Sequence, residues 1–429
     1  MGIMPEGYQP RLLDGAVDLL LSVFGAVQID GPKWCGKTWA AMAHAASVTD
    51  LDDDQVQPLV EADHSLALLG ERPHLIDEWQ MIPRVRDAVR RDIDKSGSLA
   101  GQFILTGSSA PPKEQYMHSG AGRIAHLQMR PMSLFEQGCS SGAVSLQGLY
   151  DGDFQPGKAE TGLEAHAEWI CRGGWPASLG LPLEKALLIP DQYWQAIYKD
   201  NAPRDKKDPD TTRRIVASLA KNTGSAVKLE TVRTDVFADG AEPDAKLARN
   251  TTKSYIDYLL SLYLIEELRG WGAPIKDRAR LRNKPKRYFV DPSLAASALS
   301  LNPERLLREG QVFGVLFENL CLRDLRVYAS AWAGPGQPEL FYYRDDKGLE
   351  VDVVIEMADG RWGAIEIKLG ENKADEGAAS LLALQKTATQ NPYARQLEPA
   401  FLMVLVGNGA FAHRRPDGVY VVPLTMLGA

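Results

Sequence analysis

The sequence contains few cysteines, no long apolar run and no excess of basic residues. Its four cysteines are scattered and form no C-x-x-C pair, which argues against a structural zinc site and favours a reducing compartment. Since no uncharged apolar run reaches about eighteen residues and the N-terminus lacks a signal pattern, we expect a cytoplasmic protein without a membrane span. The formal net charge is −8, so contact with nucleic acid would need a local basic patch.

One motif in the N-terminal part carries recognisable chemistry. Residues 31–38 follow the phosphate-binding pattern G-x-x-x-x-G-K-[ST]. They are Gly31, Pro32, Lys33, Trp34, Cys35, Gly36, Lys37 and Thr38. The glycines let backbone N–H groups turn towards phosphate oxygens, the lysine brings a charge to the β- and γ-phosphates, and the threonine offers a hydroxyl to Mg²⁺. The apolar run 26–30 predicts a preceding strand and the Ala-rich run 38–46 a following helix, so we expect ATP as ligand.

Two acids follow the next predicted strand, in the run His74–Gln80. Asp77 is placed to hold the Mg²⁺ shell, through water or through Thr38, and Glu78 is placed to polarise an attacking water. A surface acid pair after a strand is the plainer alternative. The pair, together with the loop upstream, predicts ATP hydrolysis rather than binding alone.

Two further elements contribute candidate residues. The buried run 103–105 ends in hydroxyl side chains, and both Thr106 and Ser108 are candidates to sense the γ-phosphate; the sequence does not choose between them. Arg123 is a candidate arginine finger acting on a neighbouring subunit, with an ordinary salt bridge as the alternative. A finger in trans would require a homo-oligomer.

The segments GPKWCGKT, LIDEWQ, FILTGSSA and GRIAHLQMRPMSLFE, in this order and at these spacings, resemble the AAA-type ATPase domain of a widespread bacterial and archaeal family. Members of that family carry a second, poorly characterised C-terminal domain. The resemblance implies Lys37, Thr38, Asp77 and Glu78 as the nucleotide site, with Arg123 as a finger. The run CRGGWP at 171–176 resembles an element that follows the ATPase core in the same family.

This chain departs from the family pattern at Trp34 and Cys35, where smaller or more polar residues are common. Because the interior positions of such a loop present backbone atoms to the phosphates, we expect the departure to do little damage.

The middle of the chain predicts a winged helix, and the resemblance agrees. Its expected elements are helices over 213–219, 229–236 and 246–262 and strands over 263–268 and 287–290. The third helix would enter a DNA groove, and its first turns carry Arg249, Asn250, Thr251, Thr252 and Lys253. The hairpin connection is basic, with Lys276, Arg278, Arg280, Arg282, Lys284, Lys286 and Arg287, and could follow a phosphate backbone. Winged helices also dock proteins.

The C-terminal part predicts a second active site. A helix over 313–320 contains Glu318, and strands over 340–344, 349–355 and 362–368 carry Asp352, Glu366 and Lys368. An acid, a later E-x-K and an upstream helix glutamate form the PD-(D/E)xK nuclease constellation, and the family's C-terminal domain is similar to this nuclease fold. Glu318, Asp352 and Glu366 supply oxygen ligands for Mg²⁺ or Mn²⁺, and Lys368 orients or deprotonates water.

Two features extend this nuclease motif. Glu350 is a spare carboxylate on the same strand face as Asp352. The family's Arg-Asp pair before the acid strand is present as Arg344-Asp345. Alternating charges on any half-exposed strand are the bland alternative.

We therefore predict an α/β protein with three domains: an AAA-type P-loop ATPase over 1–200, a winged helix over 201–300 and a PD-(D/E)xK nuclease-like domain over 301–429. The expected function is ATP hydrolysis coupled to DNA, with metal-dependent cleavage in the last domain. Two alternatives stay open: a nucleotide-dependent binding switch with an inactive nuclease-like domain, and an AAA ATPase that acts on proteins.

Overall fold

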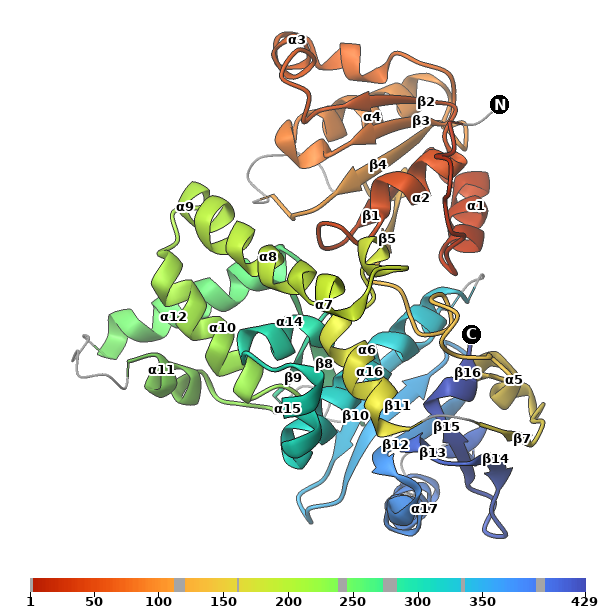
Figure 1. Cartoon of the computed structure of the whole chain (residues 1–429). Helices are drawn as coiled ribbons and strands as arrows, with labels where there is room; N and C mark the ends of the chain where they lie inside the picture. Colours follow the sequence, from red (N-terminus) through yellow and green to blue (C-terminus); the bar gives the residue numbers. More distant parts are fainter. Residues whose placement is uncertain are drawn as a thin grey trace. The chain divides into compact units, whose positions relative to one another are not determined.

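The computed structural model describes residues 3–111, 120–159, 162–237, 245–272, 284–332, 336–390 and 398–429. The chain divides into two compact units. The first comprises Met1–Pro131 together with Ser261–Leu264, and the second comprises Met132–Leu260 together with Ile265–Ala429. Both are mixed α/β structures (Figure 1), as the sequence predicts.

The first unit is built on a parallel sheet with strand order β2-β3-β4-β1-β5. Its strands are β1 (Ala26–Asp30), β2 (Ser47–Asp50), β3 (His74–Asp77), β4 (Phe103–Gly107) and β5 (Ile124–Gln128). Its helices include α1 (Asp14–Val23), α2 (Lys37–His44), α3 (Gln57–Ala62) and α4 (Val85–Lys95), with the short 3-10 helices η1 (His64–Leu68) and η2 (Trp79–Met81). The predicted strand, loop and helix around residues 26–46 are confirmed.

Both faces of this sheet are covered, which explains why its strands read as nearly continuous apolar runs. One core cluster joins Val27 and Ile29 of β1 to residues of α1 and α2. The other joins Phe103 and Leu105 of β4 to Val89 of α4. Since strand residues alternate between faces, the two clusters lie on opposite sides of the sheet and fix the strand ends that carry the first candidate site.

In the second unit the described residues form a nine-stranded sheet of order β7-β14-β15-β13-β12-β11-β10-β8-β9. The strands are β7 (Gly157–Lys158), β8 (Ile265–Gly270), β9 (Lys286–Phe289), β10 (Glu339–Arg344), β11 (Glu350–Glu356), β12 (Trp362–Gly370), β13 (Phe401–Asn408), β14 (Phe411–Arg414) and β15 (Tyr420–Pro423). A separate pair joins β6 (Val144–Ser145) to β16 (Leu427–Gly428). The hairpin that the sequence predicts at residues 340–355 is confirmed, because β10 and β11 pair antiparallel.

Helices cover both faces of this sheet near β12 and β13 (Figure 1). Helix α17 (Ala374–Thr389) packs Ala378 and Leu381 against Val404 and Val406. Helix α16 (Gly310–Ser330) lies on the other face, where Phe317 meets the backbone of Gly407. Other helices in this part include α5 (Leu146–Asp151), α6 (Leu163–Arg172), α7 (Leu183–Ala186), α8 (Leu188–Ala196), α9 (Ala202–Arg204), α14 (Pro292–Ala298) and α15 (Pro303–Arg308).

Three helices and a strand pair follow one another in the middle of the sequence, as predicted. They are α10 (Pro209–Lys221), α11 (Leu229–Phe237), α12 (Ala245–Ser261) and the antiparallel pair β8 and β9. This strand pair is not isolated, because β8 also pairs in parallel with β10. The hairpin is therefore the edge of the large sheet that carries the C-terminal candidate residues.

A buried ion cluster ties α16 to the segments before and after the Gly-Gly-Trp element. Arg323 is fully buried and donates to Asp291 at 2.9 Å and to Asp324 at 2.7 and 2.9 Å. Asp291 also accepts from the backbone N–H of Gly174 at 2.9 Å, and Asp324 accepts from that of Leu134 at 3.0 Å. Since buried charges must be paired, this cluster fixes how α16 enters the core.

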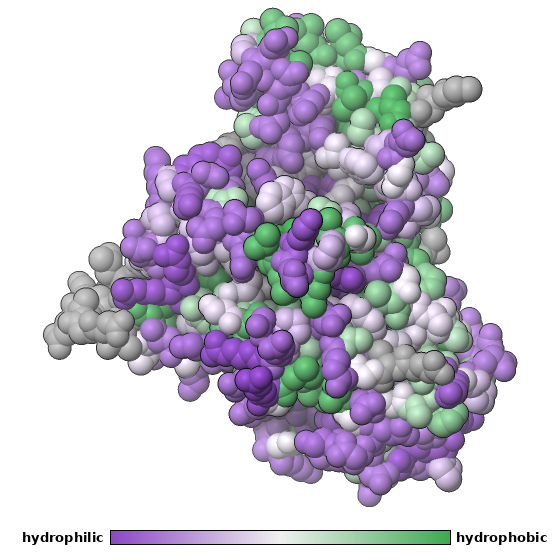
Figure 2. All heavy atoms as spheres, viewed as in Figure 1, coloured by the Kyte–Doolittle hydropathy of each residue, from purple (hydrophilic) through white to green (hydrophobic). Residues whose placement is uncertain are grey.

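The surface in the view of Figure 2 is largely hydrophilic, with apolar side chains gathered over α3. Exposed leucines there are Leu59, Leu66 and Leu69. Within the described residues, no helix combines the length and apolar character needed to cross a bilayer. The domain boundaries at 200/201 and 300/301 stay a prediction.

Candidate functional site

The phosphate-binding loop lies between β1 and α2, and its glycines have distinct roles. Gly36 has a φ of 100°, a conformation that glycine adopts without steric cost. A Cβ on Gly31 would lie 2.2 Å from the carbonyl oxygen of Met129, so a side chain cannot fit. Cys35 is fully buried and Trp34 is 52% exposed. The unusual Trp-Cys pair is thus accommodated with one side chain inward and the other outward.

The loop brings its cation and its hydroxyl to the edge of the sheet where β3 ends. The buried Lys37 ammonium donates to the carbonyl oxygen of Pro32 at 2.8 Å. The Thr38 hydroxyl lies 3.0 and 3.1 Å from the two carboxylate oxygens of Asp77, and the Thr106 hydroxyl donates to the same carboxylate. Burial raises the pKa of Asp77, against the hydrogen bonds from both threonines. The oxygens of Thr38 and Asp77 fit Mg²⁺, which prefers such hard ligands.

Glu78 has a separate set of partners. Its φ of 52° places it in the left-handed region, which costs a non-glycine residue about 1 kcal/mol or more. One carboxylate oxygen accepts from the Ser108 hydroxyl at 2.9 Å and from the amide of Gln80. The two hydroxyl candidates at the end of β4 therefore serve different acids: Thr106 contacts Asp77, and Ser108, which follows the strand, contacts Glu78.

Arg123 is not brought to this site within one chain. It directly precedes β5, whose first residue pairs with Ala26 at the start of β1, whereas the loop follows the end of β1. Its guanidinium donates to Asp94 at 2.8 Å and is 44% exposed. The salt bridge that the sequence leaves as an alternative is present.

The structure shows a buried polar network beside the loop that our sequence analysis did not predict. Arg86 of α4 donates to the Gln28 side chain at 3.0 Å, and Gln28 donates to Asp30 at 2.8 Å. The other oxygen of Asp30 is buried without a hydrogen-bond partner among the described residues, and it lies 3.1 Å from where a Cβ on Gly107 would be. The signal in the sequence that could have indicated this network is Gln28, a polar residue inside the apolar run 26–30.

The second candidate site collects acids from three elements of the second unit. Glu318 comes from α16, Glu350 and Asp352 come from β11, and Glu366 comes from β12. Lys368 donates to Glu366 at 2.5 Å, and the backbone N–H of residue 367 donates to Asp352 at 2.8 Å. The predicted glutamates, aspartate and lysine therefore lie together.

Two residues of β9 that the sequence analysis placed elsewhere also reach this cluster. The Lys286 ammonium lies 2.6 Å from Glu350 and 3.7 Å from Glu318. The Tyr288 hydroxyl donates to Glu318 at 2.5 Å. These contacts are a finding of the structure, since no motif in the sequence connects β9 with the acids.

Crowding of charge perturbs the acidic cluster. Burial and then the charge of Asp352 raise the pKa of Glu318 to about 7. The same two causes raise the pKa of Glu366 to about 8. Burial acts to lower the pKa of Lys286, but Glu318, Asp352 and Glu350 outweigh it and the pKa ends above its usual range. Carboxylates that repel one another in this way are a donor set for a divalent cation.

In the part of the chain that the structure describes, however, no three acid, histidine or cysteine side chains come close enough to share a metal ion. Glu318, Glu350 and Glu366 instead contact the two lysines and the tyrosine. A metal would have to displace these partners, so the donor chemistry fits Mg²⁺ or Mn²⁺ but the present arrangement holds none of the acids ready for it.

The candidate DNA-binding residues divide by exposure. Arg249, Asn250 and Lys253 of α12 are exposed, but the Thr252 side chain is fully buried, so our expectation that it reaches DNA is wrong. In the basic stretch, Lys276, Arg278, Arg280 and Arg282 lie outside the described residues. Lys284 is exposed. Lys286 is only 5% exposed and Arg287 pairs with Glu267 at 3.0 Å, so neither is a free surface cation.

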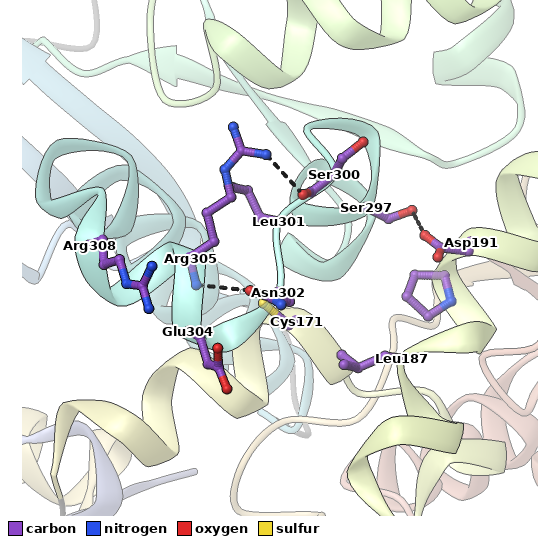
Figure 3. Close-up of a pocket in the computed structure, with 11 residues that line it drawn as sticks. Cys171, Leu187, Asp191, Ser297, Ser300, Leu301, Asn302, Glu304, Arg305 and Arg308 are labelled. Atoms are coloured by element: carbon purple, nitrogen blue, oxygen red, sulfur yellow. Dashed lines mark hydrogen bonds between the residues drawn. The ribbon is translucent and has the colours of Figure 1, made fainter.

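A pocket of about 500 Å³ lies among α6, α8, α14 and α15 (Figure 3). Asp191 accepts from Ser297 across it, and Arg305 donates to the carbonyl oxygen of Ser300 at 3.3 Å. Burial raises the pKa of the Cys171 thiol in its wall to about 12, which makes this sulfur a poor nucleophile. Both acidic and basic side chains line the pocket, so it does not select one sign of ligand charge.

Three family models match the chain in succession. Residues 24–137 match a model described as an AAA domain, residues 163–305 a domain of unknown function (DUF8612), and residues 313–427 a second domain of unknown function (DUF4143). The AAA match spans the loop, both acids and both hydroxyl residues of the nucleotide site. The N-terminal part of the chain thus matches an AAA domain with a P-loop, and this match supports an ATPase-like function.

Two curated proteins and two solved structures that match most of the chain share little sequence identity with it. The chain is 26% identical to the uncharacterized protein Rv2008c of Mycobacterium tuberculosis over 352 residues, covering 80% of this chain and 70% of that protein. The uncharacterized protein Mb2031c of Mycobacterium bovis matches equally. Among solved structures, the Walker-type ATPase PABY2304 of Pyrococcus abyssi matches with a TM-score of 0.43 at 11% identity, covering 70% of this chain and 98% of that one. The Drosophila ORC bound to DNA matches with a TM-score of 0.19 at 14% identity, covering 68% and 90%.

Proposed function

We propose that this protein binds and hydrolyses ATP with Mg²⁺ at the N-terminal loop, and that the nucleotide state governs a DNA-directed acidic site in the second unit. The observation that carries the first part is the contact of the Thr38 hydroxyl with both oxygens of Asp77, 3.0 and 3.1 Å away. These are the two groups that the chemistry requires beside a bound Mg²⁺.

Each residue at the nucleotide site has a distinct task in this proposal. The loop N–H groups and Lys37 bind the phosphates, and the lysine exchanges the Pro32 carbonyl for a β- or γ-oxygen. Thr38 and Asp77 would hold Mg²⁺, which neutralises phosphate charge when it is bound. Glu78 orients and polarises the attacking water. Thr106 holds the Asp77 carboxylate in place.

For the acidic site we propose metal-dependent cleavage of a phosphodiester. Glu318, Asp352 and Glu366 would hold Mg²⁺ or Mn²⁺, which supplies charge stabilisation for the phosphate when it is bound. Lys368 orients the attacking water or stabilises the developing negative charge. Support comes from the approach of the four residues from three elements and from the raised pKa of Glu318 and Glu366.

For DNA contact we propose the winged-helix arrangement of α10, α11, α12 and the β8–β9 pair. The order of these elements supports it, as does the exposure of Arg249, Asn250 and Lys253 on α12. Phosphate contacts by such residues position a protein on DNA without reading sequence. The proposal predicts binding that weakens steeply with salt.

For Arg123 we propose a role in trans within a homo-oligomer. Arg123 lies at the end of the parallel strands opposite to its own loop. It would therefore act on the nucleotide of a second copy, and hydrolysis would depend on protein concentration. Mixing an Arg123→Ala chain with a Lys37→Ala chain tests this: partial recovery of turnover supports the finger, and none contradicts it. Asp94→Ala removes the salt bridge without touching the arginine and is the control.

ATP hydrolysis by the purified chain, with and without DNA at low salt, tests the main proposal. We expect turnover that Lys37→Ala abolishes and that the control Lys33→Ala retains, because Lys33 is exposed in the same loop. Stimulation by DNA supports a DNA-directed function, whereas turnover indifferent to DNA favours an ATPase that acts on proteins.

Incubation with plasmid and linear DNA, with Mg²⁺ or Mn²⁺, tests the acidic site. Cutting that Lys368→Ala abolishes and that ATP modulates supports the nuclease. Lys286 and Lys368 already pair with the acids, which favours an alternative in which the acidic site does not cut DNA and the protein is a nucleotide-dependent binding switch. Under that alternative the wild type cuts no DNA while DNA-stimulated hydrolysis persists.

A further inference from the structure

Lys286 occupies an unusual position for a residue of a basic segment. It lies in a stretch with several other cations, yet its side chain is 6% exposed and its ammonium points into the acidic cluster. Its contacts there are Glu350 at 2.6 Å and Glu318 at 3.7 Å, and the ring of Tyr342 lies 5.3 Å away. A buried lysine persists only where carboxylates compensate for its lost hydration.

The sheet register explains how this lysine reaches the acids. In the β8–β9 pair, Lys286 stands opposite Leu268. Strand β8 pairs in parallel with β10, and β10 pairs in turn with β11, which contains Glu350. The Tyr342 hydroxyl of β10 also donates to the carbonyl oxygen of Lys284 at 2.6 Å. Figure 1 shows β8 and β9 beside β10 at this end of the sheet.

The cation and the acids come from different segments of the chain. Lys286 and Tyr288 belong to residues 163–305, matched by one family model, whereas Glu318 and Glu350 belong to residues 313–427, matched by another. The segment that precedes α16 thus neutralises a site that the following segment builds. This arrangement allows one segment to control the other.

The same oxygens cannot serve an ammonium and a divalent ion together. Lys286 contacts Glu350 and Glu318, and Lys368 contacts Glu366. A divalent cation at these carboxylates would lie within a few ångströms of the Lys286 ammonium, and the two like charges would repel because Lys286 and Glu366 are buried.

We propose that Lys286 is a tethered cation that competes with the divalent metal for the acidic site, so that metal binds only when β9 withdraws this side chain. The proposal rests on the metal role proposed above for Glu318 and Glu366. It adds a gate that the neighbouring segment operates.

A backbone connection links this gate to the helices proposed to contact DNA. Arg287, next to Lys286, accepts from the N–H of Gly224 at 2.9 Å and donates to the carbonyl oxygen of Ser225 at 3.4 Å. Gly224 and Ser225 form the turn between α10 and α11. A Cβ on Gly224 would lie 3.7 Å from the Glu318 carboxylate, so this turn lies over the site. Movement of α10 relative to the sheet would therefore move β9.

Mn²⁺ binding to the full chain, followed by the electron paramagnetic resonance of free Mn²⁺, tests the gate. All proteins carry Asp77→Asn and contain no nucleotide, so that the N-terminal site does not contribute. We expect Lys286→Met to bind Mn²⁺ at least about tenfold more tightly than its parent, because the competing charge is gone. Lys284→Met, on the exposed neighbour, and Lys286→Arg, which keeps the charge, should match the parent. Adding Glu366→Gln to Lys286→Met should remove the gain.

A second measurement keeps the proposal falsifiable if Lys286→Met does not fold. Amine acetylation of the unsubstituted chain, read by mass spectrometry, should modify Lys286 slowly, and saturating Mn²⁺ should raise its rate several-fold while leaving Lys284 unchanged. Unchanged Mn²⁺ affinity in a folded Lys286→Met protein, or acetylation insensitive to Mn²⁺, overturns the gate. Glu366→Gln in the Asp77→Asn parent tests the metal role separately. If it leaves Mn²⁺ affinity unchanged, the proposed metal role fails; if it lowers the affinity while Lys286→Met does not raise it, the gate alone fails.

Discussion

The two candidate sites treat their carboxylates in opposite ways. At the nucleotide site, Asp77 accepts hydrogen bonds from the uncharged hydroxyls of Thr38 and Thr106. In the acidic site of the second unit, Glu366 contacts the ammonium of Lys368, and Glu350 contacts that of Lys286. The first site leaves its negative charge for an external cation, whereas the second already contains cations of its own.

This difference bears on what each site needs before it can act. Neutral donors compete weakly with Mg²⁺, because a divalent ion gains far more from a carboxylate than a hydroxyl does. Internal lysines compete strongly, and their removal requires a change of structure. Under the proposed roles, the nucleotide site is poised for its ligands, and the acidic site depends on a rearrangement.

The largest expected effect is at Asp77, where the change removes the charge that awaits the metal. Asp77→Asn should lower ATP turnover on the order of 10²-fold or more. Nucleotide should still bind, since the loop and Lys37 are intact, but Mg²⁺ should no longer tighten its binding. Turnover assays and nucleotide titrations with and without Mg²⁺ check this.

The control for Asp77→Asn is Asp50→Asn. Asp50 stands opposite Asp77 on the neighbouring strand but is exposed, so its loss should leave turnover nearly unchanged. If both variants keep full turnover, Asp77 does not hold the metal and the contrast between the sites fails.

A second prediction concerns Arg323, a buried cation that we expect to be a permanent part of the fold, unlike Lys286. Arg323 is fully buried with two aspartates, and Arg323→Ala should destabilise the fold by about 3–5 kcal/mol because it leaves buried charge uncompensated. Denaturant unfolding measures this, with the exposed Arg308→Ala as control. A loss below about 1 kcal/mol would place Arg323 in the same class as a surface pair.

The proximity of the nucleotide-site residues is easier to predict from the sequence than that of the residues in the acidic site, for a physical reason. Residues 31–38 and 77–78 lie next to strand ends whose apolar runs are visible locally, so the parallel sheet places them together. The role of Lys286 depends on which strand forms the sheet edge beside β10, and a basic run carries no sign of that pairing. The hydrogen bond between Gln28 and Arg86 was not predicted because these two residues lie 58 positions apart in the chain.

The pH dependence of stability tests whether charge crowding in the acidic site is real. The pKa values of about 7 for Glu318 and about 8 for Glu366 lie above the ordinary 4.5, so the folded state holds protons that the unfolded state releases. Their stabilising contribution is complete below pH 4.5 and is lost as pH rises through 7 to 8. Each shifted unit corresponds to about 1.4 kcal/mol at most.

Glu318→Gln with Glu366→Gln should flatten this decline, because a glutamine has no proton to lose. Thermal melts from pH 5 to pH 9 compare the pair with the unsubstituted chain and with Glu398→Gln, an exposed glutamate. If stability declines with pH equally in all three proteins, the lysines already neutralise the acids. That result would support the proposed role of Lys286 and contradict the charge crowding.

The smallest expected effect concerns the neutral donors themselves. Ser108→Ala removes one hydrogen bond to Glu78, 2.9 Å long, and a neutral hydrogen bond contributes about 1 kcal/mol. We expect a small loss of stability and a turnover change of less than about tenfold, since Gln80 still holds the carboxylate. Thr106→Ser keeps the hydroxyl on Asp77 and is the matched control on the same strand. If Ser108→Ala abolishes turnover while nucleotide binding is intact, then Ser108 contacts the γ-phosphate or the attacking water, and the nucleotide site is less prepared in this structure than its hydrogen bonds indicate.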